Sequence, residues 1–145
     1  MSEQQAFLDF NLAPTVLRRD VAILGLLHKR VLCQSHRTFE KLLPFYSERF
    51  DTGRGFGHTK QLCGQWLEAT HHPKLSGKSV LLIVDIYNNL RQHVVDAPSV
   101  SSFQRFLTQQ TRERCKQGDP LWQFSFNKRS RSSAQDSDSD LVELD

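Results

Sequence analysis

Residues 15–33, "TVLRRDVAILGLLHKRVLC", carry the periodicity that most restricts the fold of this chain. Their apolar residues recur every three or four positions, the spacing that lines one face of an α-helix. Pro14 precedes the run and suits the first turn of a helix, where its missing N–H costs no hydrogen bond. A helix with one apolar face has to bury that face, so the rest of the chain must cover it. The apolar residues are Val16, Leu17, Val21, Ile23, Leu24, Leu27 and Val31.

The basic residues of the same helix gather on its other side and give the chain a charge asymmetry. The whole chain carries a net charge of +3, residues 1–13 and 128–145 each carry −2, and residues 14–127 therefore carry +7. Such a segment is compatible with a nucleic-acid partner bound through phosphates, and equally with an ordinary solvated surface. The candidate nucleic-acid contacts are Arg18, Arg19, Lys29 and Arg30 on the helix, with Arg54 and Lys60 in the glycine-containing loop 51–60.

Further segments have helical spacing or helix stop signals. Residues 35–50 predict a short helix with Phe39, Leu42 and Leu43 on one face and Pro44 as its stop. Residues 101–116 predict a helix ended by Gly118.

Two more segments, residues 60–72 and 119–128, contain apolar residues that could join the core. Residues 60–72 are compatible with a helix carrying Leu62, Trp66 and Ala69. The aromatic residues of 119–128 are expected to fold back onto the core.

The stretch "SVLLIVDIYNNLRQHVVD", residues 79–96, raises the question of whether Asp85 ends a strand and binds a metal ion. Its β-branched residues favour a strand, whereas the spacing of its apolar residues favours a helix over 79–91. No second acidic residue adjoins Asp85, and two-metal sites need several carboxylates. We therefore expect Asp85 to be a solvated residue on a helix, pointing away from the apolar face.

Other chemistry is poorly supported by the spacing of reactive residues. The cysteine and histidine residues form no four-ligand zinc set, and loop 51–60 lacks the Gly-Lys-Ser/Thr ending of a phosphate-binding loop. His28 lies on the apolar face, where hydrogen bonding to a neighbouring carbonyl is the expected role. We predict no metal, no cofactor and no catalytic residue.

These observations predict a small all-α bundle of four or five helices. We expect an N-terminal lead-in at 1–13, a helical domain at 14–127 and a disordered acidic tail at 128–145. No apolar run is long enough to span a bilayer, so no membrane association is expected. The acidic N-terminus and three widely spaced cysteines predict an intracellular protein, nuclear or cytoplasmic.

Residues 86–107, "IYNNLRQHVVDAPSVSSFQRFL", resemble the closing segment of LINE-type (non-LTR) retrotransposon reverse transcriptases. The matching positions are Asn88, Leu90, Val94, Val95, Pro98, Ser99, Phe103 and Leu107. Residues 12–32 are similar to the helix that follows the polymerase thumb in that family, and "FEKLLPF" to the short segment after it. The resemblance covers about residues 8–115, with Tyr87 in place of the usual Trp and Arg91 in place of the usual Pro.

The resemblance implies a non-catalytic accessory C-terminal segment of an RNA-directed DNA polymerase, binding RNA or DNA and packing on the polymerase thumb domain. The aromatic-x-Asp-Asp motif of the polymerase palm does not occur in the sequence, so this chain is expected not to be an enzyme. No small-molecule substrate is evident. The alternative is a protein-interaction module or an inactive remnant of a transposable element.

Overall fold

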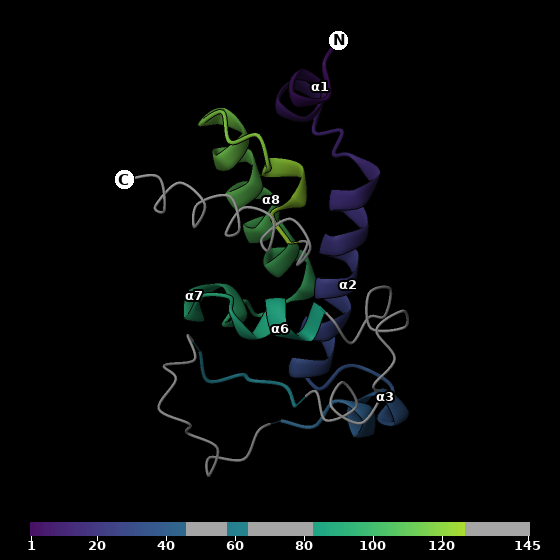
Figure 1. The fold of residues 1–145 in the computed structure, drawn as a ribbon. Helices are drawn as coiled ribbons and strands as arrows, with labels where there is room; N and C mark the ends of the chain where they lie inside the picture. The colour runs from purple at the N-terminus through teal and green to yellow at the C-terminus, as the bar shows by residue number, and fades with distance from the viewer. Residues whose placement is uncertain (46–57, 64–82, 127–145) are drawn as a thin grey trace, which may run out of the picture.

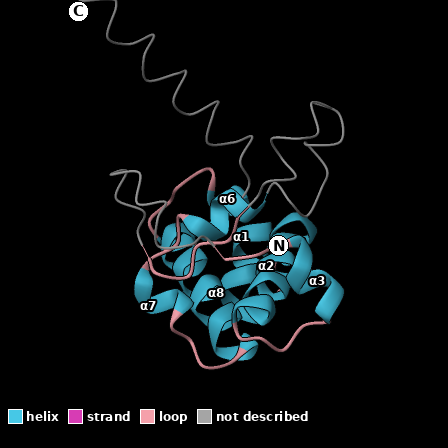
Figure 2. Ribbon diagram, turned by 90° about the horizontal axis from the view of Figure 1, so that it is seen from below, coloured by secondary structure: helices cyan, strands magenta, loops and turns pink. Residues whose placement is uncertain are grey.

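The computed structural model describes residues 1–45, 58–63 and 83–126. Within these ranges all regular structure is helical, apart from one isolated bridge between Phe45 and Leu62, so the predicted all-α class is confirmed (Figure 2). The expected tail at 128–145, Arg54, and most of the helix expected at 60–72 lie outside the described residues. The described elements are α1 (Glu3–Phe10), α2 (Thr15–Val31), α3 (Arg37–Leu42), α6 (Ile83–Asn88), α7 (Gln92–Val95), α8 (Val100–Lys116) and the 3-10 helix η3 (Trp122–Phe124).

The two longest described helices, α2 and α8, lie side by side and antiparallel at the centre of the fold (Figure 1). Gln104 of α8 donates to the carbonyl of Val21 at 3.4 Å, and a Cβ atom at Gly25 would collide with the same Gln104 side chain. At the other end of the pair, Arg112 reaches back to Asn11. Gly25 thus makes room for Gln104 where the helices cross.

The ends of α2 and α8 follow from local sequence signals. Pro14 precedes α2, as predicted. Ser99 caps α8 in a reciprocal pair of hydrogen bonds with Ser102, satisfying N–H groups that have no helical partner. Gly118, at φ +77°, follows the C-terminus of α8 in the left-handed conformation that glycine adopts at little cost, as expected from its position.

The expected lead-in at 1–13 contains a helix, α1, which Ser2 caps by accepting from the N–H of Gln5. Phe7 of α1 is fully buried and stacks on Trp122 at 5.2 Å between ring centroids. Arg112 of α8 donates to the carbonyls of Phe7 and Leu8 at the end of α1. The prediction that the aromatic residues after α8 fold back onto the core is confirmed for Trp122 and Phe126, both of which are buried.

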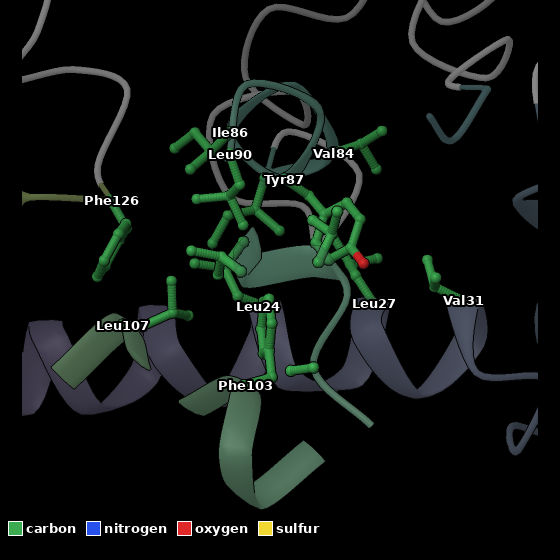
Figure 3. Close-up of a cluster of buried hydrophobic side chains, with 14 of the residues drawn as sticks. Leu24, Leu27, Val31, Val84, Ile86, Tyr87, Leu90, Phe103, Leu107 and Phe126 are labelled. Atoms are coloured by element: carbon green, nitrogen blue, oxygen red, sulfur yellow. The ribbon is translucent and has the colours of Figure 1, made fainter. Parts of the chain in front are cut away.

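The helical interpretation of residues 79–91 is confirmed for α6, whereas residues 79–82 lie outside the described residues. Tyr87 of α6 is fully buried and lies over α2, next to Phe103 of α8 (Figure 3). The three helices therefore share one apolar core. Its labelled members in Figure 3 are Leu24, Leu27, Val31, Val84, Ile86, Tyr87, Leu90, Phe103, Leu107 and Phe126.

Candidate functional site

The solvent face of α2 carries three of the predicted nucleic-acid contacts. Arg18, Arg19 and Lys29 are all exposed there. At 1.5 Å per residue, Arg18 and Lys29 are about 16 Å apart along the helix axis. Ala22 and Leu26 lie on the same face between them, so it is basic at both ends and apolar in the middle.

Arg30 was predicted to belong to this exposed basic face, and that prediction is wrong. Its side chain is buried, its Nε donates to the carbonyl of Leu43 at 2.9 Å, and its guanidinium lies 4.5 Å from the ring centroid of Phe45. The physical reason is its position three residues after Leu27, which places it on the side of α2 that the end of α3 covers. Arg30 therefore links α2 to the residues that follow α3.

The other candidates do not join the α2 face into one site. Lys60 is exposed, but it belongs to segment 58–63, which is bonded to α6 through His58 and Asn88. Sequence reasoning missed Arg105, an exposed basic residue of α8 next to Gln104 at the contact with α2. The helical periodicity of 101–116 could have singled it out, because Arg105 lies on the polar side of that helix.

Asp20 is the one acidic residue of α2, and it is buried. Its Oδ1 lies 3.5 Å from Nε of Arg19, whereas its Oδ2 has no hydrogen-bond partner. Burial raises the pKa of this carboxyl group, and Arg19 partly opposes that rise. Arg19 is therefore partly engaged by its neighbour, while Arg18 and Lys29 have no ion pair among the described residues.

A shallow groove runs between α2 and α8 beside the basic face. Its α2 side is mostly aliphatic and its α8 side is polar, with Arg18 at the edge. The lining residues are Ala13, Leu17, Arg18, Val21, Ala22, Gln104 and Thr108. The groove thus combines apolar walls with a basic edge.

His28 is fully buried and forms two hydrogen bonds within the core. Its Nε2 lies 2.9 Å from the carbonyl oxygen of Ala97, and its Nδ1 lies 2.9 Å from the hydroxyl of Tyr87. Because a carbonyl can only accept, Nε2 carries the proton, and in the neutral ring Nδ1 accepts from Tyr87. The imidazole also stacks on Phe103 at 4.2 Å. The prediction that His28 bonds a carbonyl is confirmed.

His58 is also buried and also bonds Tyr87, through the backbone carbonyl of that residue. Its Nε2 donates to the carbonyl of Tyr87 at 2.9 Å, and its Nδ1 accepts from the N–H of Lys60 at 3.0 Å. The side-chain amide of Asn88 pairs with both backbone groups of Leu62 at 2.9 Å. These contacts fasten segment 58–63 to α6.

Burial keeps this network uncharged. It lowers the pKa of His28 and of His58, with the carbonyls of Ala97 and Tyr87 opposing the effect, and it raises the pKa of the Tyr87 hydroxyl. A buried tyrosine with a raised pKa is a poor proton donor to a substrate. The network is better suited to holding three segments together than to catalysis.

The two histidines should make the protein less stable in mild acid. Since their pKa values are lowered in the folded state, the unfolded chain binds more protons below its histidine pKa of about 6.5. The urea midpoint should therefore fall as the pH is lowered from 7.5 to 5.5. The raised pKa of Asp20 acts in the opposite direction, so Asp20→Asn removes this opposing contribution and leaves that of the histidines. A midpoint that rises on acidification in the Asp20→Asn protein would contradict the prediction.

Asp85, the residue considered as a metal ligand, lies half-buried in the first turn of α6. Among the described residues, no three of the His, Cys, Asp or Glu side chains are close enough together to hold a metal ion. The absence of metal chemistry stays a prediction for the whole chain. None of the described helices is long and apolar enough to cross a membrane.

The positions that carry the retrotransposon resemblance have structural roles. Leu90, Val94, Val95, Phe103 and Leu107 are buried in the core. Two polar positions also stabilise the fold, since Asn88 pairs with the Leu62 backbone and Ser99 caps α8. Arg91, in place of the usual Pro, precedes α7 with a φ of −73° that proline would also adopt.

In comparisons with known proteins, the chain matches no family model, no curated protein and no solved structure.

Proposed function

We propose that this chain is a non-catalytic helical module that binds RNA or DNA through backbone phosphates. The observation that carries the proposal is the shared exposure of Arg18, Arg19 and Lys29 on one face of α2. Charged side chains spread along a rigid helix suit a regularly charged polymer, since each can neutralise a separate phosphate. Asp20, the acidic residue of this helix, is turned into the protein and leaves the face positive.

The biological setting we propose is the C-terminal part of a LINE-type reverse transcriptase. The support is the resemblance over residues 8–115, whose matching positions are mostly buried or capping residues. Buried and capping residues stabilise a fold and do not take part in a reaction, so we propose an accessory role. RNA-directed DNA synthesis would then belong to a polymerase domain outside this chain.

A protein-interaction module is the second candidate, and one observation favours it. Phe10 and Leu12 are 60% and 63% exposed, and they lie three positions and one position before Ala13, which lines the groove between α2 and α8. Exposed apolar residues next to a groove are typical of protein contacts. A polymerase thumb domain is the partner that the resemblance implies.

Nucleic-acid binding should depend steeply on salt and on the α2 face. Each phosphate contact on duplex DNA contributes about 0.9 to the slope of log affinity against log salt concentration. Replacing Arg18, Arg19 and Lys29 by Gln should therefore flatten the slope by roughly three units at most, with no change of fold. Arg30 is left unchanged, because its buried hydrogen bond supports the fold. Fluorescence anisotropy with a labelled duplex and a labelled single-stranded RNA, between about 50 and 200 mM salt, measures the effect.

A matched control separates the α2 face from net charge. The control residues Arg37, Lys41 and Lys116 are exposed on other parts of the surface. Their replacement by Gln also removes three positive charges. This variant should keep most of the wild-type slope. Equal losses in the two variants would show that binding follows net charge alone, and no binding by the wild-type chain at about 50 mM salt would refute the proposal.

A further inference from the structure

The groove between α2 and α8 has a lining that nucleic acid does not explain. Ala13, Val21 and Ala22 present aliphatic carbon to it, and phosphates gain nothing from such a surface. Gln104 and Thr108 of α8 form its polar side. A ligand with both apolar and acidic groups would match the walls and the basic edge together.

One basic residue lines this groove, and a second lies next to the lining on α8. Arg18 lines it from α2. Arg105 adjoins Gln104 on α8, and at 100° per residue it lies on the outer flank of the side that carries Gln104 and Thr108. Arg105 has no ion pair among the described residues. An acidic ligand seated in the groove would therefore meet Arg18 in the lining, with Arg105 on the adjoining flank of α8.

The chain itself contains a segment with the complementary chemistry. Residues 136–145, "DSDSDLVELD", hold five acidic residues, no basic residue, and the three apolar residues Leu141, Val142 and Leu144. Leu141 and Val142 have acidic residues directly on both sides, Asp140 and Glu143. An aliphatic group with adjacent acids fits an aliphatic groove with basic flanks.

The length of chain between the two is sufficient. Phe126 is buried in the same apolar core as Leu107 and Leu24 (Figure 3). Leu141 follows Phe126 by fifteen residues, which can span up to about 50 Å at roughly 3.3 Å per residue. The whole of α2 is only about 26 Å long at 1.5 Å per residue. A tether of this length also supplies an effective concentration on the order of millimolar, so even weak docking would be occupied.

We propose that residues 136–145 dock in the groove between α2 and α8, with their leucines against Ala13, Val21 and Ala22 and their acids facing Arg18 and Arg105. One consequence rests on the proposed function: the docked segment competes with nucleic acid for Arg18. The segment would then act as a built-in inhibitor of the basic face. Docking itself requires no nucleic acid and can be measured without it.

Amide spectra of the full chain and of a chain ending at Gln135 test the docking. Removal of the segment should shift the amide signals of Val21, Ala22 and Thr108 and leave those of α3 in place. Replacing Leu141, Val142 and Leu144 by Ser in the full chain should reproduce the same shifts while keeping every charge. Unchanged groove signals in both altered chains would overturn the proposal.

A substitution in the groove provides the reciprocal test. Ala22 is exposed at the groove, so Ala22→Glu should repel the acidic segment and abolish the difference between full and shortened chains. Gln109→Glu, an exposed change on α8 away from the lining, should preserve that difference. Groove signals that shift with protein concentration and not with removal of the segment would show a second copy as the occupant, and docking would be wrong.

Nucleic-acid titrations separate this inference from the proposed function. If the segment is docked nine-tenths of the time, shortening the chain should tighten binding roughly tenfold at low salt. Shifts on shortening without any nucleic-acid binding would leave docking standing and refute the proposed function. Binding that is equal in both chains, without groove shifts, would refute docking alone.

Discussion

Replacing His28 by alanine should lower the free energy of unfolding by about 4 kcal/mol, a large fraction of the roughly 5–15 kcal/mol that stabilises a typical domain. The substitution leaves the carbonyl of Ala97 and the hydroxyl of Tyr87 buried without partners, at about 1–3 kcal/mol for each group. It also opens a cavity against Phe103, whose ring stacks on the imidazole. Urea denaturation followed by circular dichroism measures the change.

His93 provides the matched control for this prediction. It is exposed, and its ring meets only the edge of Phe106 at 6.1 Å between centroids. His93→Ala should therefore change the midpoint very little. If His28→Ala costs less than about 1 kcal/mol, the buried network contributes far less to the fold than its geometry indicates.

Replacing Phe7 by alanine should destabilise the protein by about 3 kcal/mol and detach α1 from the core. Phe7 is fully buried against Trp122, with the guanidinium of Arg112 at 5.6 Å from its ring. An eight-residue helix is too short to persist without tertiary contacts, so α1 should lose its helical structure when this contact is removed. Denaturant unfolding gives the stability, and hydrogen exchange of the α1 amides shows whether the helix opens.

The same helix contains its own control. Phe10 is 60% exposed, three residues after Phe7. Phe10→Ala should leave both the midpoint and the amide protection of α1 nearly unchanged. Rapid exchange throughout α1 in the wild-type protein would show that α1 is not held by Phe7 at all.

The parts of the fold that could be predicted are those determined by neighbouring residues. The periodicity of α2, its start after Pro14 and the end of α8 before Gly118 are all local properties. The α1 helix was not predicted, because its one buried residue, Phe7, depends on Trp122, which is 115 positions away. An octapeptide in which a single residue is buried is too short to show a recognisable period.

The site shows the same division between local and distant information. Helix geometry placed Arg18, Arg19 and Lys29 on the exposed face, but it could not show that α3 ends over Arg30. His28 was expected to bond a carbonyl, yet the identities of Ala97 and Tyr87 depend on how α6 and the segment between α7 and α8 pack on α2. The groove could not be foreseen either, since it exists only between two helices that are far apart in sequence.

The antiparallel pairing of α2 with α8 has a consequence for synthesis on the ribosome. The apolar face of α2 ends at Val31, whereas Leu107, Trp122 and Phe126, which complete its core, come much later in the chain. At about 5–20 residues per second, roughly 5–20 s separate the appearance of α2 from that of Phe126. During this interval α2 has an uncovered apolar stripe and no lasting partner, which makes the nascent chain a natural client for chaperones that shield exposed leucine and valine.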